Sequence, residues 1–253
     1  MIIITGPGRS GTSLLAALYQ HFGYDPGGNW RPEVNAGLES YDVVAINHSI
    51  ARDLGVTVGT GKSVQRAHIS DYVGDSLAAS IKRHIPADAV EVIRRRFIVL
   101  PWRREYRVKL VKWSVVASVA RKYRKQLNDL ASEKTVVKDP NFSWTLPVWL
   151  EAQAPISNVI VATREIERMV ASRYSSRLTG IASETNARNT MIYGLGLCLS
   201  SAWDHGVDVR LLRYPDFLAD IPSLQRSLPL LEGLDAETFR IGAERVIRPD
   251  LVH

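Results

Sequence analysis

Residues 1–15 read MIIITGPGRSGTSLL, and this stretch decides the fold that we expect for the rest of the chain. Ile2 to Thr5 is a short apolar run that ends at glycine, which is typical of a buried parallel strand. From Thr12 to Phe22 apolar residues recur at helical spacing, and Gly23 follows them. The glycine loop between the two therefore lies at a helix N-terminus, where backbone N–H groups and the helix dipole favour an anion.

The loop reads GPGRSGTS over residues 6–13 and departs from a nucleotide-triphosphate loop at one position. That motif, G-x-x-x-x-G-K-[ST], uses its lysine to reach the β- and γ-phosphates. Gly6 and Gly11 have the required spacing, whereas Thr12 stands in place of the lysine. The alternative interpretation is a tight strand-to-helix turn that binds nothing. A second stretch, GTGKS at residues 59–63, has Val56 in place of the first glycine and no apolar helix after it, so we interpret it as a surface turn.

Strands and helices alternate along the rest of the chain. We expect strands over residues 134–138, 158–163 and 207–213, and helices over about 39–53, 139–153, 165–178 and 186–204. The middle third, roughly residues 72–130, is interpreted as helices with an irregular centre around Pro101. The alternation predicts one α/β domain over residues 1–253, a three-layer sandwich with a central parallel sheet and ligands outside the carboxyl ends of the strands.

The composition is that of an ordinary globular protein, with 45% apolar and 23% charged residues. No apolar run approaches the ~20 residues that span a bilayer, and no charged segment precedes the first apolar run as in a secretory signal. We therefore expect a cytoplasmic protein with no transmembrane segment. Cys198 is the single cysteine, which excludes an internal disulfide, and its apolar neighbours predict that it lies in the core.

Positive charge is concentrated in one part of the chain, whose net charge is +6. Residues 94–125 hold twelve Lys or Arg and one acid, Glu105. Such a block attracts nucleic acid, anionic lipid or an anionic substrate, but on a helix we prefer to interpret it as a solvated face. Because acids predominate elsewhere, no nucleic-acid partner is expected.

Four stretches together resemble the sulfotransferases that use 3′-phosphoadenosine 5′-phosphosulfate. GPGRSGTSLL is similar to the family's 5′-phosphosulfate loop, in which Lys or Arg precedes Ser-Gly-Thr. VVKDPNFSWTLPVWLE, residues 136–151, resembles a strand-end lysine followed by a Pro-rich helix start. VIVATREIERMVASRYSSR, residues 159–177, resembles a strand ending in arginine with a serine eight residues on, and LLRYPDFLADIPSLQRSLPLLEGL, residues 211–234, resembles a strand followed by Tyr-Glu-Asp-Leu. The four matches occur in order over most of the chain.

The resemblance implies a P-loop-NTPase-like sulfotransferase fold, with 3′-phosphoadenosine 5′-phosphosulfate (PAPS) as donor, 3′,5′-diphosphoadenosine (PAP) as product and no metal. Arg164 and Ser172 are implied to bind the 3′-phosphate. The residues implied to hold the 5′-phosphosulfate are Gly8, Arg9, Ser10, Gly11, Thr12 and Ser13. The hydroxyls of Thr12 and Ser13 equally fit the cap of a helix.

The resemblance also gives a reason for the missing lysine. A sulfuryl group carries less negative charge than a γ-phosphoryl group, so its transfer requires neither Mg²⁺ nor a lysine that clamps a triphosphate. Arg9 can instead supply positive charge near the bridging oxygen as the 5′-phosphate leaves, and Lys138 at its strand end can reach the same group. The acceptor is expected to be a hydroxyl of a small molecule, glycan or lipid.

The sequence offers several candidates for the base that would deprotonate the acceptor hydroxyl. Cytosolic members of the family carry a histidine two residues beyond the strand-end lysine, but that position is Pro140, which cannot accept a proton. The candidates are therefore nearby carboxylates, Glu39, Asp139 and Glu33, and Glu39 aligns with the glutamate of an Asn-Pro-x-Gly-Tyr-Trp-Glu-like segment in bacterial members. Glu39 equally fits a first-turn acid that complements a helix dipole.

Two other functions are weighed against this one. An NTP-dependent small-molecule kinase or NTPase would use the same loop, but Thr12 stands at its lysine position. A non-catalytic nucleotide-binding protein would explain Pro140 as a lost base. The sequence has no metal-ligand spacing among its histidines and carboxylates, and no G-x-S-x-G elbow of a serine hydrolase.

Overall fold

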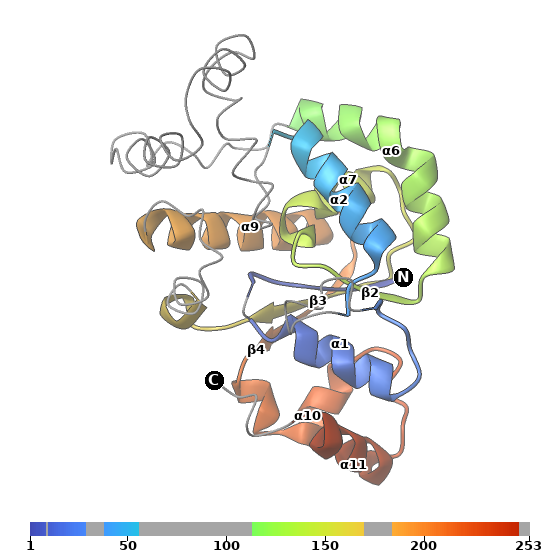
Figure 1. The fold of residues 1–253 in the computed structure, drawn as a ribbon, viewed down its shortest axis with the longest axis vertical. Helices are drawn as coiled ribbons and strands as arrows, with labels where there is room; N and C mark the ends of the chain where they lie inside the picture. The colour runs from blue at the N-terminus through green and yellow to red at the C-terminus, as the bar shows by residue number, and fades with distance from the viewer. Residues whose placement is uncertain (9, 29–37, 56–112, 170–183, 248–253) are drawn as a thin grey trace, which may run out of the picture.

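The computed structural model describes residues 1–8, 10–28, 38–55, 113–169 and 184–247. Within them, four parallel strands form one sheet in the order β2-β1-β3-β4 (Figure 1). The strands are β1 (Ile2–Thr5), β2 (Val136–Lys138), β3 (Asn158–Thr163) and β4 (Asp208–Arg213). The helices are α1 (Thr12–His21), α2 (Tyr41–Asp53), α6 (Trp113–Glu133), α7 (Phe142–Glu151), α9 (Glu184–Asp204), the 3₁₀ turn η2 (Asp216–Leu218), α10 (Ile221–Arg226) and α11 (Ala236–Val246). The predicted α/β class and parallel sheet are confirmed.

Two apolar cores lie on opposite faces of the sheet, because successive side chains of a strand point to opposite sides. Ile3, Val137 and Val161 pack with residues of α2, α6, α7 and α9. Ile2 and Ile4 pack with residues of α1, α10 and α11 on the other face (Figure 1). The central strand β1 is buried along its whole length, as its unbroken apolar run predicts. Helices therefore cover both faces, which is consistent with the expected three layers.

The chain changes face at the carboxyl end of β1. The helix that follows β1, α1, packs with α11 below the sheet in Figure 1, whereas α7 and α9 pack together on the opposite face after β2 and β3. In open parallel sheets a crevice forms where neighbouring strands send their connections to opposite faces, and ligands bind there. Gly6 and Gly11 of the glycine loop lie at this position.

The element bounds follow the predicted ones closely, with one difference that matters for the site. β1 and β3 have the predicted bounds, but α2 begins at Tyr41 and not at Glu39. Leu38 has a left-handed backbone (φ 64°) and Ser40 an extended one, so Glu39 lies in the approach to the helix. The alternative interpretation of Glu39 as a first-turn acid is therefore wrong.

Some predictions fall partly or wholly outside the described residues. These are the irregular centre around Pro101, the GTGKS stretch at 59–63 and most of the helix expected over 165–178. Cys198 is buried, as predicted. In the described ranges, no helix combines the length and the apolar character needed to cross a membrane.

Candidate functional site

The loop between β1 and α1 needs glycine at two positions for steric reasons. Gly6 has φ 148°, and a Cβ there would lie 2.1 Å from the carbonyl oxygen of Ala162. Gly11 has φ 96°, and a Cβ there would lie 2.9 Å from the ring of Tyr214. A Cβ on Gly8, by contrast, would have no atom within 4 Å. Packing therefore explains Gly6 and Gly11, whereas the space beside Gly8 is open.

The N-terminus of α1 has several features that suit an anion. Its N-cap residue, Gly11, has no side chain, and no acidic residue lies in its first turn. Ser10 is fully buried, and its Oγ finds no hydrogen-bond partner among the described residues. Thr12 is buried and Ser13 half-buried at the same end of the helix. Because buried polar atoms are normally hydrogen-bonded, the Ser10 hydroxyl beside a helix N-terminus suits an anion that supplies the missing acceptor. Arg9 lies outside the described residues.

Lys138 and Glu39, which were predicted from separate motifs as catalytic residues, are in direct contact. Lys138 ends β2, paired with Ile4 of β1, and its Nζ donates a hydrogen bond to Oε1 of Glu39 at 2.5 Å. The lysine side chain is 2% exposed and the glutamate 17%. A buried ammonium is tolerated only when it is paired, so Glu39 stabilises Lys138 at the end of the sheet.

A tight crossing of two segments holds Glu39 in place. The N–H of Glu39 donates to the carbonyl of Gly28 at 3.0 Å. Gly27 has φ 121°, and a Cβ there would lie 2.1 Å from the backbone nitrogen of Ser40. The N–H of Gly27 in turn donates to the Asp25 carboxylate at 3.0 Å. Glu39 is thus fixed by backbone contacts on both sides. Glu33, the other carboxylate considered, lies outside the described residues.

Asp139 differs from Glu39 because it is enclosed. It is 1% exposed, its Oδ1 accepts the backbone N–H of Asn141 at 2.9 Å, and its Oδ2 accepts from Nδ2 of Asn47 at 2.8 Å. Burial raises the pKa of Asp139 to about 6, the nearby Glu39 carboxylate adds to the rise, and the hydrogen bond from Asn47 opposes it. Because both oxygens already bond to protein groups, Glu39 is the better placed of the two to meet a substrate.

Asn47 was not predicted from the sequence. It is fully buried, and its Oδ1 accepts hydrogen bonds from Thr145 Oγ1 and Trp149 Nε1, each at 2.8 Å. It therefore joins α2 to α7 as well as to Asp139. The only sequence signal was an asparagine within the apolar side of a helix, which by itself does not identify its partners.

Arg164 follows β3 at the same edge of the sheet. Its guanidinium lies 5.1 Å from the centroid of the Tyr214 ring, which is a cation–π distance. Tyr214 also contacts the Gly11 position, and its N–H donates to the carbonyl of Thr163 at 2.7 Å. One buried ring therefore lies against both Arg164 and the start of α1. Ser172, the predicted partner of Arg164, lies outside the described residues.

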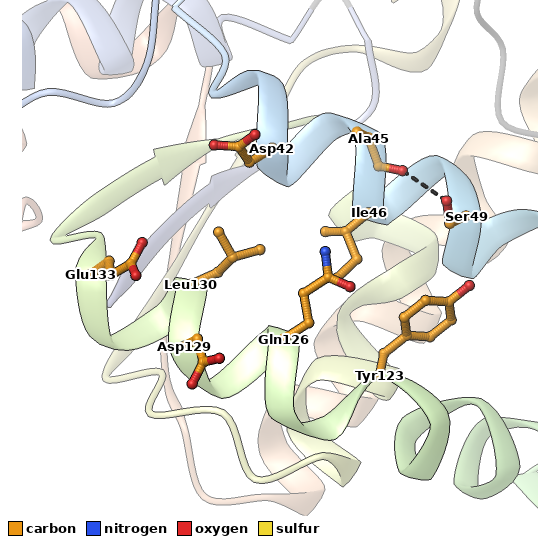
Figure 2. Close-up of a pocket in the computed structure, with 9 residues that line it drawn as sticks. All are labelled: Asp42, Ala45, Ile46, Ser49, Tyr123, Gln126, Asp129, Leu130 and Glu133. Atoms are coloured by element: carbon orange, nitrogen blue, oxygen red, sulfur yellow. Dashed lines mark hydrogen bonds between the residues drawn. The ribbon is translucent and has the colours of Figure 1, made fainter.

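A separate groove of about 330 Å³ lies between α2 and α6 (Figure 2). Three of its lining side chains are carboxylates, and none of the candidate donor-binding residues lines it. The lining residues are Asp42, Ala45, Ile46, Ser49, Tyr123, Gln126, Asp129, Leu130 and Glu133. An acidic groove repels a phosphorylated donor, so the donor site is expected at the loop and not here.

Part of the basic block at 94–125 lies on α6, and the rest lies outside the described residues. The basic side chains on this helix are exposed. Lys122 pairs with Asp53 and Lys125 with Asp129, each at 2.6 Å. On α6 these charges have the features of a solvated helix face.

Comparisons with protein-family models, with curated proteins and with solved structures found no match to this chain. The function is therefore argued from the residues and their geometry. In the part of the chain that the structure describes, no group of three or more His, Cys, Asp or Glu side chains is arranged to hold a metal ion.

The loop glycines make the first prediction. Gly11→Ala places a Cβ against Tyr214 on a left-handed backbone, so it should lower the free energy of unfolding by about 1–3 kcal/mol. Gly8→Ala, whose Cβ enters open space, should change it by less than about 0.5 kcal/mol. Denaturant unfolding of both variants measures the difference. Equal stability of the two variants would contradict the described path of the loop.

The enclosed carboxylate makes the second prediction. Because the pKa of Asp139 rises from 3.8 to about 6 on folding, the native state binds its proton more tightly than the unfolded state. Its contribution to stability is thus fully present below pH 3.8 and is lost as the pH rises through about 6.

Asp139→Asn lacks this titration. The free energy of unfolding of the wild type, minus that of the variant, should therefore fall with rising pH, by on the order of 1–3 kcal/mol in total. Urea unfolding at several pH values between about 4.5 and 7.5 measures this slope. A difference that does not change with pH would show that Asp139 is hydrated and not buried.

Proposed function

We propose that this chain is a sulfotransferase that moves a sulfuryl group from PAPS to an acceptor hydroxyl, on a P-loop-NTPase-like sulfotransferase fold. The observation that carries the proposal is the buried Ser10 Oγ beside the N-terminus of α1, which has no hydrogen-bond partner among the described residues. A buried lysine, Lys138, ends the strand next to β1. We take both features as support for a bound anion.

The donor is proposed to span the ends of β1 and β3. Its 5′-phosphosulfate lies over the loop and the first turn of α1, and Arg164 with Ser172 holds its 3′-phosphate. Tyr214 supports this arrangement, since it contacts both the Gly11 position and the Arg164 guanidinium. The loop residues assigned to the donor are Gly8, Arg9, Ser10, Gly11, Thr12 and Ser13.

The reaction is proposed as an in-line displacement. The acceptor oxygen forms a bond to sulfur as the bond between sulfur and the bridging oxygen breaks, and PAP leaves with the negative charge. Lys138, together with Arg9, stabilises this charge. Glu39 accepts the hydroxyl proton, and its contact with Lys138 at 2.5 Å brings the base beside the group that stabilises the leaving oxygen.

Nucleotide choice tests the donor assignment. Calorimetry without Mg²⁺ should show PAP binding more tightly than AMP, because only PAP carries the 3′-phosphate. Arg164→Ala should reduce the ratio of the affinities for PAP and AMP by about 10- to 150-fold, which corresponds to the loss of a charge-assisted contact of about 1.5–3 kcal/mol. Arg213→Ala is the matched control, since this exposed arginine at the end of β4 pairs with Glu165 and Asp216.

Equal affinities of the wild type for PAP and AMP would contradict the assignment of the 3′-phosphate site. If ATP with Mg²⁺ is bound and hydrolysed instead, the kinase or NTPase alternative holds. Tight binding of PAP with no transfer to any small-molecule, glycan or lipid hydroxyl favours the non-catalytic binding protein.

The base makes a separate prediction. If Glu39 deprotonates the acceptor, Glu39→Gln should lower kcat by about 10²–10⁴. Asp139→Asn should cause the smaller loss, since its carboxylate is enclosed. If steady-state kinetics show the larger loss of kcat in Asp139→Asn, then Asp139 and not Glu39 is the base.

A further inference from the structure

Two consecutive residues at the carboxyl end of β2 hold α2 in place. Lys138 contacts Glu39, which lies two residues before α2. Asp139 accepts a hydrogen bond from Asn47, in the second turn of the same helix. The Lys138–Glu39 pair lies in the candidate site, whereas the Asp139–Asn47 pair is wholly buried. The position of α2 over the sheet is therefore set at two points by one strand end.

The amide of Asn47 has one orientation available to it. Its Nδ2 donates to Oδ2 of Asp139, while its Oδ1 accepts from Thr145 and Trp149, all at 2.8 Å. The other buried residues of α2 are all apolar: Val43, Val44, Ile46, Ile50 and Ala51. Apolar contacts are non-directional and tolerate small shifts of a helix, whereas a satisfied buried polar network selects one arrangement. Asn47 thus fixes the register of α2 along its axis.

We propose that Asn47 is a positioning residue that sets Glu39 against Lys138 through its hydrogen bond to Asp139. This inference rests on the proposed role of Glu39 as the base. A rigid helix transmits a shift at Asn47 to the residues just before its first turn, and a displacement of about 1 Å in a catalytic group can cost 10²-fold in rate. Asn47 itself is fully buried behind Asp139 and is assigned no contact with substrate.

The two sides of the Asn47 amide supply a matched control. Thr145→Val removes the hydroxyl that donates to Asn47 Oδ1 and to the carbonyl of Asn141, at nearly constant volume, and leaves the bond from Asn47 Nδ2 to Asp139 in place. Asn47→Ala removes the link to Asp139 together with the bonds from Thr145 and Trp149, and it leaves room for a water to donate to the Asp139 carboxylate. Both variants lose bonds in the same buried network, but only the second removes the hydrogen bond from α2 to Asp139 at the end of β2.

Steady-state kinetics of these variants test the inference. Asn47→Ala should lower kcat by about 10- to 100-fold with PAP affinity within about threefold of the wild type, because the loop and Arg164 bind PAP. Thr145→Val should keep kcat within about threefold. In the Glu39→Gln background, Asn47→Ala should cost less than about twofold, because the group that it positions is gone. An equal loss of kcat in both backgrounds overturns the inference.

Hydrogen exchange provides a readout that does not depend on activity. Amides in the peptide that spans residues 38–46 should exchange faster in Asn47→Ala than in the wild type, and at the wild-type rate in Thr145→Val. If the wild type transfers no sulfuryl group but this difference is found, the proposed function fails and the positioning of Glu39 stands. If transfer occurs and exchange is the same in both variants, the positioning inference fails. Should Asn47→Ala lose cooperative unfolding, Asn47→Ser takes its place with the same expected outcomes, because its shorter side chain does not reach Asp139 but can bond a buried water.

Discussion

The buried ammonium of Lys138 is the constraint on which the candidate site depends. A charge that is 2% exposed at the end of a strand is costly by several kcal/mol unless an opposite charge lies beside it. Glu39 supplies that charge, and the chain must therefore cross over the end of β2 before α2 can begin. The tight crossing at Gly27 and Gly28, the left-handed Leu38 and the hydrogen bond from Asn47 to Asp139 all serve this placement.

Two criteria for the catalytic base, a perturbed pKa and access to substrate, select different carboxylates in this site. Strongly perturbed pKa values cluster at functional sites, and the raised value belongs to Asp139. Burial is its main cause, and the two oxygens of Asp139 already bond to Asn47 and Asn141. The perturbed group therefore has a structural role in our account, and the partly exposed Glu39 beside it is assigned the proton transfer.

Local features of the site could be predicted from the sequence, and contacts between distant segments could not. The β1 strand, the glycine loop and α1 are adjacent in the chain, so apolar spacing and two glycines were enough to place them. The Lys138–Glu39 pair joins residues 99 apart, and no pattern in one sequence sets such a distance. Asn47 was missed for the same reason, because its partners are Asp139, which follows β2, and two residues of α7. The start of α2 was misplaced because Glu39 fits a helix first turn, and only its pairing with Lys138 shows why it stays outside.

The central claim is that one bound nucleotide joins the end of β1 to the end of β3. A crystal structure of the protein with PAP tests it most directly. Our account predicts the 5′-phosphate at the N-terminus of α1, within hydrogen-bond distance of Ser10 Oγ, and the 3′-phosphate beside the Arg164 guanidinium. PAP bound elsewhere, for instance in the groove between α2 and α6, or bound with its 5′-phosphate away from α1, would contradict it.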